Sequence, residues 1–509
     1  MKTNIIKWFA SLLMVSAVSF AGAQTTDELL QLSTQDVQGT ARFSGMGGAF
    51  NALGGDFGSL SVNPAGIATY RSSEFTITPT ITSNKTKTDF LNTSTSQNRT
   101  RFGLANVGYV ATVMTGKTTG LVSFNFGLGY NKTANFYKKA EANGYGSRNS
   151  VVDMYADYAN RYNLNANYLN NEYFDDILPE DWSTAIAYGT SLIDYDDANK
   201  RYYPNGIDNG DMFDINRYSY QTGSSGEYVA SFGGNISNKF QFGISVGLQD
   251  IEYVNGISYT EYAAANNTGL YDIGMKDEYT RTVGSGINTK LGVILRPVDQ
   301  LRIGLAVHSP TWFSLEREYD VYVGSQFLDE TSASGEQTPS DLYKYKLQTP
   351  YKIEAGLAFV IGKYGLVSFD YEYVGNNGMR IRDNVWYDLG YINERNDKIK
   401  NAYKGTSNIR IGAEVNLPYA LMLRGGYNYF QSPYDDSSLD FDRNAYSFGF
   451  GYRNKNFFID FAYTLNTGNY HYVPYYVNDY RVIDADTNPQ IAVEKESIGK
   501  FMATIGFKF

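Results

Sequence analysis

A two-residue alternation of apolar with small or polar side chains recurs along most of this sequence. In the segment 122–130 the even positions carry Val, Phe, Phe, Leu and Tyr, whereas the odd positions carry Ser, Asn, Gly and Gly. Segments 240–248, 301–307, 353–359 and 446–452 repeat the pattern. Successive side chains of a β-strand point to opposite faces, so this period predicts strands with one apolar face. Each run approaches the roughly 9 to 11 residues that a tilted strand needs to cross a membrane.

The charged residues of these segments fall on the face opposite the apolar one. An alternating strand can belong to a soluble sandwich, with its apolar face inward, or to a membrane barrel, with that face outward. The period alone does not separate the two architectures. The charged residues are Lys290, Arg302, Lys352, Glu354, Asp370, Glu372, Arg410, Glu414, Arg424 and Asp460.

Connection lengths favour the barrel. The connections alternate between short ones, such as 237–238 and 362–363, and long ones, such as 131–226 and 309–349. Short periplasmic turns, long extracellular loops and periplasmic chain ends are typical of bacterial outer-membrane barrels, so we predict an all-β transmembrane antiparallel barrel of about 14 strands. The predicted strands are 74–82, 102–112, 120–130, 227–236, 239–248, 286–295, 300–308, 350–361, 364–374, 407–415, 420–429, 444–452, 456–464 and 499–509.

Composition agrees with an exported barrel. Mean hydropathy is −0.37, yet aromatic residues make up 16% of the chain. Only half of the residues in each barrel strand face lipid, which explains the low mean hydropathy. Aromatic side chains gather at the two membrane interfaces, which explains the high aromatic fraction. The chain has no Cys, which excludes disulfides and thiolate sites. A net charge of −10 argues against a nucleic-acid partner.

Residues 1–23 have the features of a cleavable signal peptide. Lys2 and Lys7 supply positive charge, residues 8–20 form an apolar stretch, and Ala21-Gly22-Ala23 provides a cleavage site. The apolar stretch is shorter than the roughly 20 residues that a membrane-spanning helix needs.

The last strand alternates up to the terminal residue, Phe509. A terminal strand that ends in Phe resembles the signal by which barrel proteins are recognised during outer-membrane assembly. We therefore expect Phe509 to be an assembly signal and the barrel assembly machinery to be a partner. The alternative role of Phe509 is that of a plain hydrophobic chain end.

Residues 24–73 do not alternate and precede the first strand. They contain a glycine-rich stretch, 41–50, and then Asn63-Pro64-Ala65. No Lys-Ser/Thr follows the glycines and no strand precedes them, so the stretch is not a phosphate-binding loop. The segment is too small for a core of its own, so we expect residues 24–73 to form a hatch inside the barrel of residues 74–509.

The motifs around and after this segment resemble the FadL-like family of outer-membrane transporters for long-chain fatty acids and other hydrophobic compounds. The resemblance spans the hatch and the barrel. It rests on Asn63-Pro64-Ala65, 284–286, 292–293, Arg296-Pro297, 301–305, His308-Ser309-Pro310, 347–350 and Ser432-Pro433, in that order.

The resemblance implies a 14-stranded barrel in the outer membrane that transports hydrophobic compounds such as long-chain fatty acids. Extracellular loops would capture the solute, which would then leave sideways into membrane lipid beside an inward-kinked third strand. The third predicted strand is 120–130, and Gly127, Gly129 and Asn131 are the candidates for this opening because glycine tolerates strained backbone. The aromatic residues of loop 131–226, Tyr137, Tyr155, Tyr158, Tyr162, Tyr168, Tyr173 and Trp182, could line a capture site or simply lie near the headgroups.

The inward-facing cations Arg302, Lys352, Arg410 and Arg424 are candidate contacts for a ligand anion. Most of the inward charges are expected to pair with one another, because an unpaired charge in a low-dielectric lumen is costly. The sequence offers no catalytic constellation, metal-ligand cluster or cofactor motif, and His308 is expected to be a hydrogen-bonded lumen residue. An enzyme is therefore not expected.

Two other functions remain open. A general diffusion porin would give a large steady conductance in planar bilayers, which a hatch-filled lumen disfavours. A non-transporting barrel that serves as an adhesin or as a secretion or assembly accessory would copurify with a stoichiometric protein partner and without bound lipid.

Overall fold

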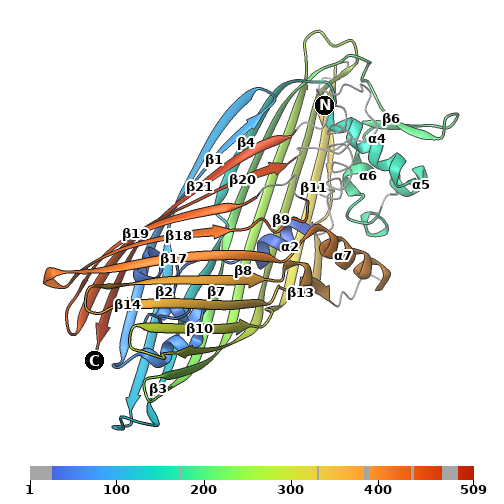
Figure 1. Cartoon of the computed structure of the whole chain (residues 1–509). Helices are drawn as coiled ribbons and strands as arrows, with labels where there is room; N and C mark the ends of the chain where they lie inside the picture. The colour runs from blue at the N-terminus through green and yellow to red at the C-terminus, as the bar shows by residue number, and fades with distance from the viewer. Residues whose placement is uncertain (1–25, 172, 329–331, 383–388, 437–440, 473–490) are drawn as a thin grey trace, which may run out of the picture.

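The chain forms one closed barrel (Figure 1). The computed structural model describes residues 26–171, 173–328, 332–382, 389–436, 441–472 and 491–509, so the predicted signal peptide lies outside the described residues. Within these ranges, 14 antiparallel strands make the wall, and β1 (Glu74–Phe90) closes it by pairing with β21 (Ala492–Lys508). The predicted architecture is confirmed, and every predicted strand overlaps an observed one.

The other wall strands follow in chain order: β2 (Thr93–Met114), β3 (Leu121–Asn135) with its continuation β4 (Lys138–Ser147), β7 (Phe213–Ile236), β8 (Phe240–Ala263), β9 (Tyr271–Leu295), β10 (Leu301–His308) with β11 (Trp312–Phe327), β13 (Asp341–Gln348) with β14 (Lys352–Ile361), β15 (Gly365–Val374) with β16 (Arg380–Arg382), β17 (Thr406–Leu417), β18 (Leu421–Phe430), β19 (Arg443–Arg453) and β20 (Phe457–Tyr472). A short strand, β12 (Ser334–Gln337), pairs with β11.

Three neighbouring wall strands are interrupted at the same level. Ser309-Pro310-Thr311 separates β10 from β11, Thr349-Pro350-Tyr351 separates β13 from β14, and the short helix η4 (Asn376–Gly378) separates β15 from β16. Proline cannot donate a ladder hydrogen bond, which accounts for the first two breaks. Across them, Thr349 N donates to Thr311 O (3.0 Å), so the wall stays joined.

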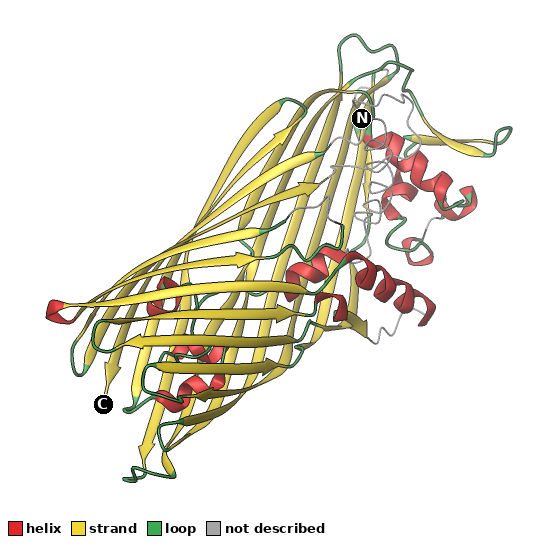
Figure 2. Cartoon of the chain, viewed as in Figure 1, coloured by secondary structure: helices red, strands yellow, loops and turns green. Residues whose placement is uncertain are grey.

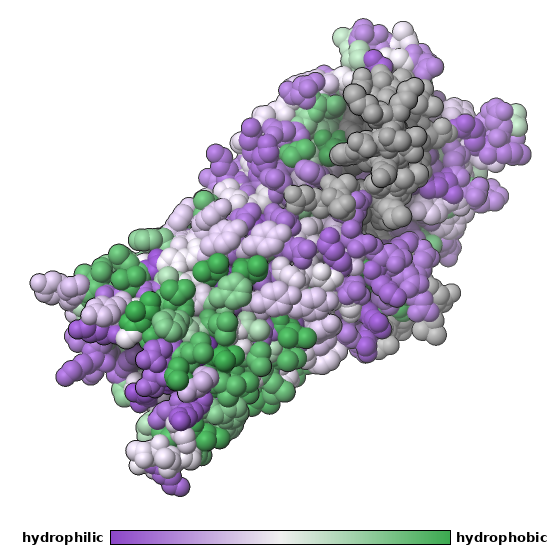
Figure 3. Space-filling view, in the orientation of Figure 1, coloured by the Kyte–Doolittle hydropathy of each residue, from purple (hydrophilic) through white to green (hydrophobic). Residues whose placement is uncertain are grey.

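Apolar side chains face outward and charged side chains face inward, as the alternation predicts. Leu128, Leu291 and Phe359 are 63%, 54% and 53% exposed, whereas Glu354 and Asp460 are buried. Figure 3 shows the apolar side chains gathered over the part of the barrel that holds the short turns, with polar side chains at the other end. This distribution marks the band that contacts lipid.

The short turns are where the sequence predicts them, but much of the predicted long loops is strand (Figure 2). For example, β1 and β2 continue to a tight turn at Leu91-Asn92, where both residues have positive φ. β8 and β9 likewise extend through most of the predicted loop 249–285. These extensions were missed because the outward apolar column ends with the lipid band: in β8 the outward positions Asp250 and Glu252 are polar, and the apolar residues Ile251 and Tyr259 lie on the inner face.

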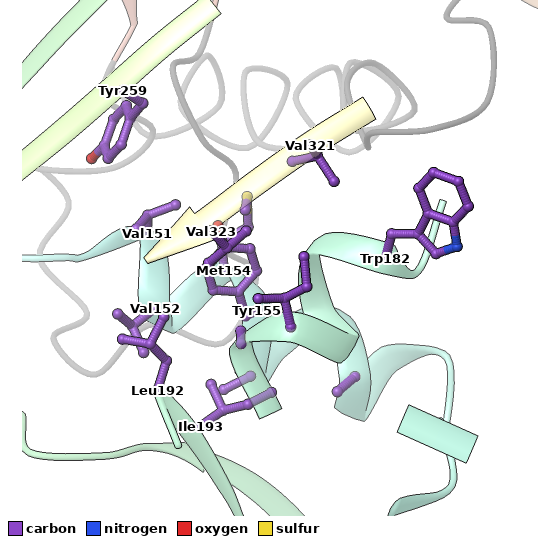
Figure 4. Close-up of a cluster of buried hydrophobic side chains, with 14 of the residues drawn as sticks. Val151, Val152, Met154, Tyr155, Trp182, Leu192, Ile193, Tyr259, Val321 and Val323 are labelled. Carbon is purple, nitrogen blue, oxygen red and sulfur yellow. The ribbon is translucent and has the colours of Figure 1, made fainter. Parts of the chain in front are cut away.

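The loop 131–226 contains a folded cap, residues 148–212. Its elements are α4 (Val151–Arg161), α5 (Ala166–Leu169), η3 (Phe174–Asp176), α6 (Trp182–Gly189), β5 (Ile193–Asp196) and β6 (Arg201–Pro204). The cap packs on extracellular extensions of the wall, including Tyr259 of β8 and Val321 of β11 (Figure 4). Tyr155 and Trp182 are 1% and 4% exposed. Both expected roles are therefore wrong for these two side chains, because they form the core of the cap.

The segment ahead of β1 lies inside the barrel. It comprises α2 (Thr26–Ser33), α3 (Ala41–Gly45), η1 (Phe57–Ser61) and η2 (Pro64–Thr69), drawn in blue among the strands of Figure 1. We call residues 26–73 the hatch. A further helix, α7 (Leu389–Ala402), packs near α2, and η5 (Pro418–Ala420) forms a turn. None of the described helices is both long enough and apolar enough to span a membrane.

Glycines on the inner face of the wall make room for the hatch. A Cβ added to Gly304 of β10 would lie 2.3 Å from the carbonyl oxygen of Asn51, and one added to Gly108 of β2 would lie 2.3 Å from the ring of Phe57. On β18, a Cβ on Gly426 would lie 2.4 Å from a backbone nitrogen of the hatch. Because these strands lie far apart around the wall, the hatch fills the lumen from side to side.

The adjacent residues Gly425 and Gly426 provide a matched test of this fit. Gly426→Ala would force the hatch backbone to move and is expected to cost about 1–3 kcal/mol of stability. At Gly425 an added Cβ comes no closer than 4.0 Å to its neighbours, so Gly425→Ala should be tolerated. Thermal unfolding in detergent, followed by circular dichroism, measures the difference; equal melting temperatures for the two variants would contradict the tight fit.

Candidate functional site

A cavity of about 540 Å³ lies in the extracellular half of the lumen. Residues of α2 and the hatch residues that follow it border the cavity, together with the wall strands, the β3–β4 junction, the cap helix α4 and the segment after β18. Its aromatic lining residues are Phe136, Tyr253, Tyr259, Tyr319, Phe430, Tyr434, Phe441, Tyr470 and Tyr472. These rings provide a large apolar surface that also carries hydroxyl groups.

The aromatic residues are held by contacts with α2 and with each other. Phe136 packs edge-on against Tyr253, with ring centroids 5.2 Å apart. The hydroxyls of Tyr403 and Tyr434 donate to Asp27 of α2 at 3.0 and 2.9 Å. Burial raises the pKa of Asp27, and these two hydrogen bonds partly oppose the shift. The hatch therefore helps to shape the cavity.

Two of the cations in the lining have no carboxylate partner among the described residues. Arg217 of β7 stacks over the ring of Tyr472 at 4.7 Å, and Arg443 of β19 stacks over Phe430 at 5.2 Å. Within the described ranges, neither guanidinium has a carboxylate within ion-pair distance; Asp36, whose charge acts on Arg443, is paired with Lys500. The sequence did not single out these two arginines, because each lies toward the extracellular end of its strand, beyond the clear alternation.

Only one of the four predicted ligand contacts lines this cavity. Lys352 does so, and it donates to Gln35 of the hatch at 2.9 Å. Arg302 donates to the carbonyl of Leu53, at 2.9 Å. Arg410 pairs with Glu372 at 2.7 Å, and Arg424 pairs with Glu414 and Asp460 at 2.6 and 2.7 Å. The expectation that the inward charges pair with one another is thus met, and it leaves Arg302, Arg410 and Arg424 away from the cavity.

The predicted hatch motif joins the hatch to the wall. Asn63 caps η2 by accepting a hydrogen bond from Ala65 N at 3.0 Å. Its amide donates to the carbonyls of Asn51 and of Val293 in β9 at 2.8 and 3.2 Å. Pro64 occupies the first position of η2, where its missing N–H costs nothing.

The third wall strand leaves the wall shortly after its predicted glycines. Gly127 and Gly129 lie in regular strand, paired with both β2 and β7. Pairing with β2 ends at Asn131, opposite Asn106, and the pairing with β7 shifts register between Lys132 and Ala134. The departure of the strand from β2 therefore starts at Asn131, the last of the three predicted residues. The two glycines instead face the hatch, Gly127 toward Ile67 and Gly129 toward Phe57.

Beyond Asn131 the strand turns toward the lumen. Ala134, Asn135, Phe136 and Lys138 line the cavity. The main chain of this segment is held by side chains of the β1–β2 hairpin: Asn84 donates to Tyr137 O at 3.2 Å, and Thr86 donates to Lys139 O at 2.6 Å. Side chains of the hairpin, in place of a backbone ladder, thus cover the segment.

Because of this departure, residues 93–105 of β2 have no strand partner on the side of β3. We call this opening between β2 and β3 the gap. Tyr137 fills part of it. Its ring lies 3.7 Å from the guanidinium carbon of Arg101 and 4.9 Å from that of Arg99. The sequence placed Tyr137 only among the loop aromatics, because its stacking partners lie on another strand.

Two further predicted residues have structural contacts. His308 is buried in the lumen, with Nε2 2.7 Å from the carbonyl oxygen of Val62, as expected for a hydrogen-bonded lumen residue. Phe509 is 67% exposed, stacks on Tyr109, and donates its N–H to Ser73 O at 3.1 Å. Its role in assembly stays a prediction.

Residues 231–473 match the family described as outer membrane protein transport protein (OMPP1/FadL/TodX). The resemblance to the FadL-like family is confirmed. The crystal structure of a Pseudomonas aeruginosa FadL homologue shares the fold of this chain, with a TM-score of 0.53, 10% identity, and coverage of 94% of this chain and 100% of that one. No curated protein matches the sequence.

Two toluene transporters also share the fold. For TodX of P. putida the TM-score is 0.50 at 13% identity, with 93% of this chain and 99% of that chain covered. For TbuX of Ralstonia pickettii the values are 0.50 and 14%, with the same coverage. The chain is accordingly an outer-membrane barrel, and the family that residues 231–473 match is one of transport proteins.

The buried pairs around Arg424 should be essential to the FadL-like barrel. Arg424→Met would leave Glu414 with only Arg42 and would remove the close partner of Asp460, so we expect a loss of about 3–5 kcal/mol of stability. Denaturant unfolding measures it. Lys200→Met, which breaks the exposed pair with Asp197, should leave the unfolding midpoint unchanged. A similar small effect for both variants would show that the lumen network does not hold the barrel together.

Proposed function

We propose that this barrel transports hydrophobic compounds, with long-chain fatty acids as candidate substrates, from the outside into the outer leaflet of the outer membrane. The observation that carries the proposal is the inward course of residues 131–138. One short segment lines the lumen cavity with Phe136 and borders the gap with Tyr137. A solute in the cavity is therefore separated from the side of the barrel by a single layer of chain.

Release through the gap suits the energetics of an apolar solute. Moving from an aromatic cavity into lipid preserves the roughly 25 cal/mol per Å² that burial of apolar surface provides. Passage toward the periplasm would instead require the hatch to open, since residues 26–73 fill the lumen and are joined to the wall by Asn63 and by buried ion pairs. We therefore assign the gap, rather than the hatch, as the exit.

The lining favours an amphipathic substrate with an anionic end. Among the described residues no carboxylate pairs with Arg217 or Arg443, and the aromatic rings beside them offer apolar surface. A carboxylate bound there would complete charge-assisted hydrogen bonds that the protein itself does not make. These two arginines replace Arg302, Arg410 and Arg424 as proposed contacts for the ligand anion.

Replacing either arginine should weaken binding of a fatty acid. For Arg217→Gln or Arg443→Gln we expect the dissociation constant for oleate to rise about ten-fold, the loss of one charge-assisted contact. Binding of the matching fatty alcohol should not change, and Arg281→Gln, at an exposed pair with Glu252, is the control variant. Titration calorimetry of the detergent-purified barrel gives these constants. Unchanged oleate binding in both variants would remove the arginines from the site.

Tyr137 should limit the rate of exit. Tyr137→Ala removes the ring between Arg99 and Arg101, so transfer of a fluorescent fatty acid into the lipid of reconstituted vesicles should become faster. Tyr145→Ala, at an exposed position of β4, is the control. Stopped-flow fluorescence measures the transfer rate. If vesicles with and without the wild-type barrel take up the probe equally fast, the transport proposal itself fails.

A further inference from the structure

The gap carries a cluster of cations to which the transport proposal assigns no role. Arg101 and Arg99 stand opposite Thr82 and Asn84 of β1, on the inner side of β2. Arg101 is exposed at the edge that β3 leaves, and Arg99 and Lys132 are half-buried beside it. A Cβ added to Gly103 of β2 would lie 3.4 Å from the ammonium nitrogen of Lys132, so the Lys132 side chain reaches across to β2. Three positive charges therefore meet where the two strands separate.

These cations have no acidic partner in the part of the chain that the structure describes. Elsewhere in the lumen, Lys290 pairs with Glu227 and Lys500 with Asp36. No carboxylate of the described residues lies within ion-pair distance of Arg99, Arg101 or Lys132. Asp250 of β8 attracts Lys132 from farther away, whereas Arg101 and Lys500 repel it. In a chain with a net charge of −10, an unneutralised cluster of this kind is poised to bind an anion.

The position of the cluster relative to the membrane indicates which kind of anion it binds. Next to Arg101, Phe102 points to the outer face of β2 and is 71% exposed; farther toward the periplasm, Leu128 of β3, opposite Tyr109, is 63% exposed. Beyond this level the exposed positions of β1 are polar, with Lys85 and Lys87. The cluster therefore lies where the apolar band ends and the headgroups of the outer leaflet begin.

We propose that the gap binds the phosphate-bearing headgroup of an anionic lipid of the outer leaflet. The guanidinium of Arg101 and the ammonium of Lys132 contact the phosphate, with Arg99 contributing to the positive field. Guanidinium groups suit phosphate oxygens because they offer paired N–H donors. The acyl chains lie on Phe102 and Leu128, which a free phosphate ion would leave uncovered. This binding requires the barrel to be in a membrane but does not require it to transport.

Native mass spectrometry of the detergent-purified barrel tests the proposal with three probes: phosphatidic acid, phosphatidylcholine with the same acyl chains, and inorganic phosphate. We expect one tightly bound phosphatidic acid, and about ten-fold weaker binding of it in Arg101→Gln/Lys132→Gln. The matched control is Lys85→Gln/Lys87→Gln, which removes the same charge from the outer face of β1 and should bind like the wild type. Phosphatidylcholine should bind more weakly than phosphatidic acid.

Three results would overturn the proposal. An equal loss in both double variants would show a general charge effect without a site. Equal retention of the two lipids would show that the anionic charge is not recognised. Displacement of phosphatidic acid by millimolar inorganic phosphate would show a site for free anions. If the double variant does not fold, Arg101→Gln alone, at an exposed side chain, serves in its place and is expected to weaken binding in the same direction.

Discussion

The structure depends on the need to pair every backbone N–H and C=O group that crosses hydrocarbon. No water is present there to replace a missing partner, so the wall must close, and β1 meets β21 along most of its length. Closure fixes the sides of the strands: apolar columns face lipid, and polar columns face a narrow interior. Everything placed in that interior must then satisfy buried charges and polar groups, which explains the dense ion pairs around Arg410 and Arg424.

The hatch meets this requirement together with the wall. Arg42 of the hatch pairs with Glu414 of β17, Asn63 donates to carbonyls of β9 and β10, and inner-face glycines let the two backbones approach closely. The periplasmic half of the lumen is therefore tightly packed. The extracellular half, where the strand extensions and the cap stand apart, keeps the cavity.

The wall departs from full strand pairing at the border between the packed periplasmic half and the open extracellular half of the lumen. At Asn131 the third strand gives up its ladder with β2, and side chains of Asn84 and Thr86 take over part of the hydrogen bonding. An unpaired strand edge is costly in hydrocarbon but tolerable at headgroup level, where water and polar groups can approach it. The same edge borders the proposed exit and the proposed lipid site.

The sequence by itself determined the number of wall strands, their lipid-facing sides, the short turns and the polar interior. These features follow from a two-residue period that each strand carries locally. The tertiary structure alone decided which charges pair, that the strand leaves the wall at Asn131 instead of at Gly127 or Gly129, and that Arg217 and Arg443 line the cavity stacked on aromatic rings. Those outcomes depend on contacts between residues hundreds of positions apart, such as Arg217 with Tyr472, and no local period encodes them.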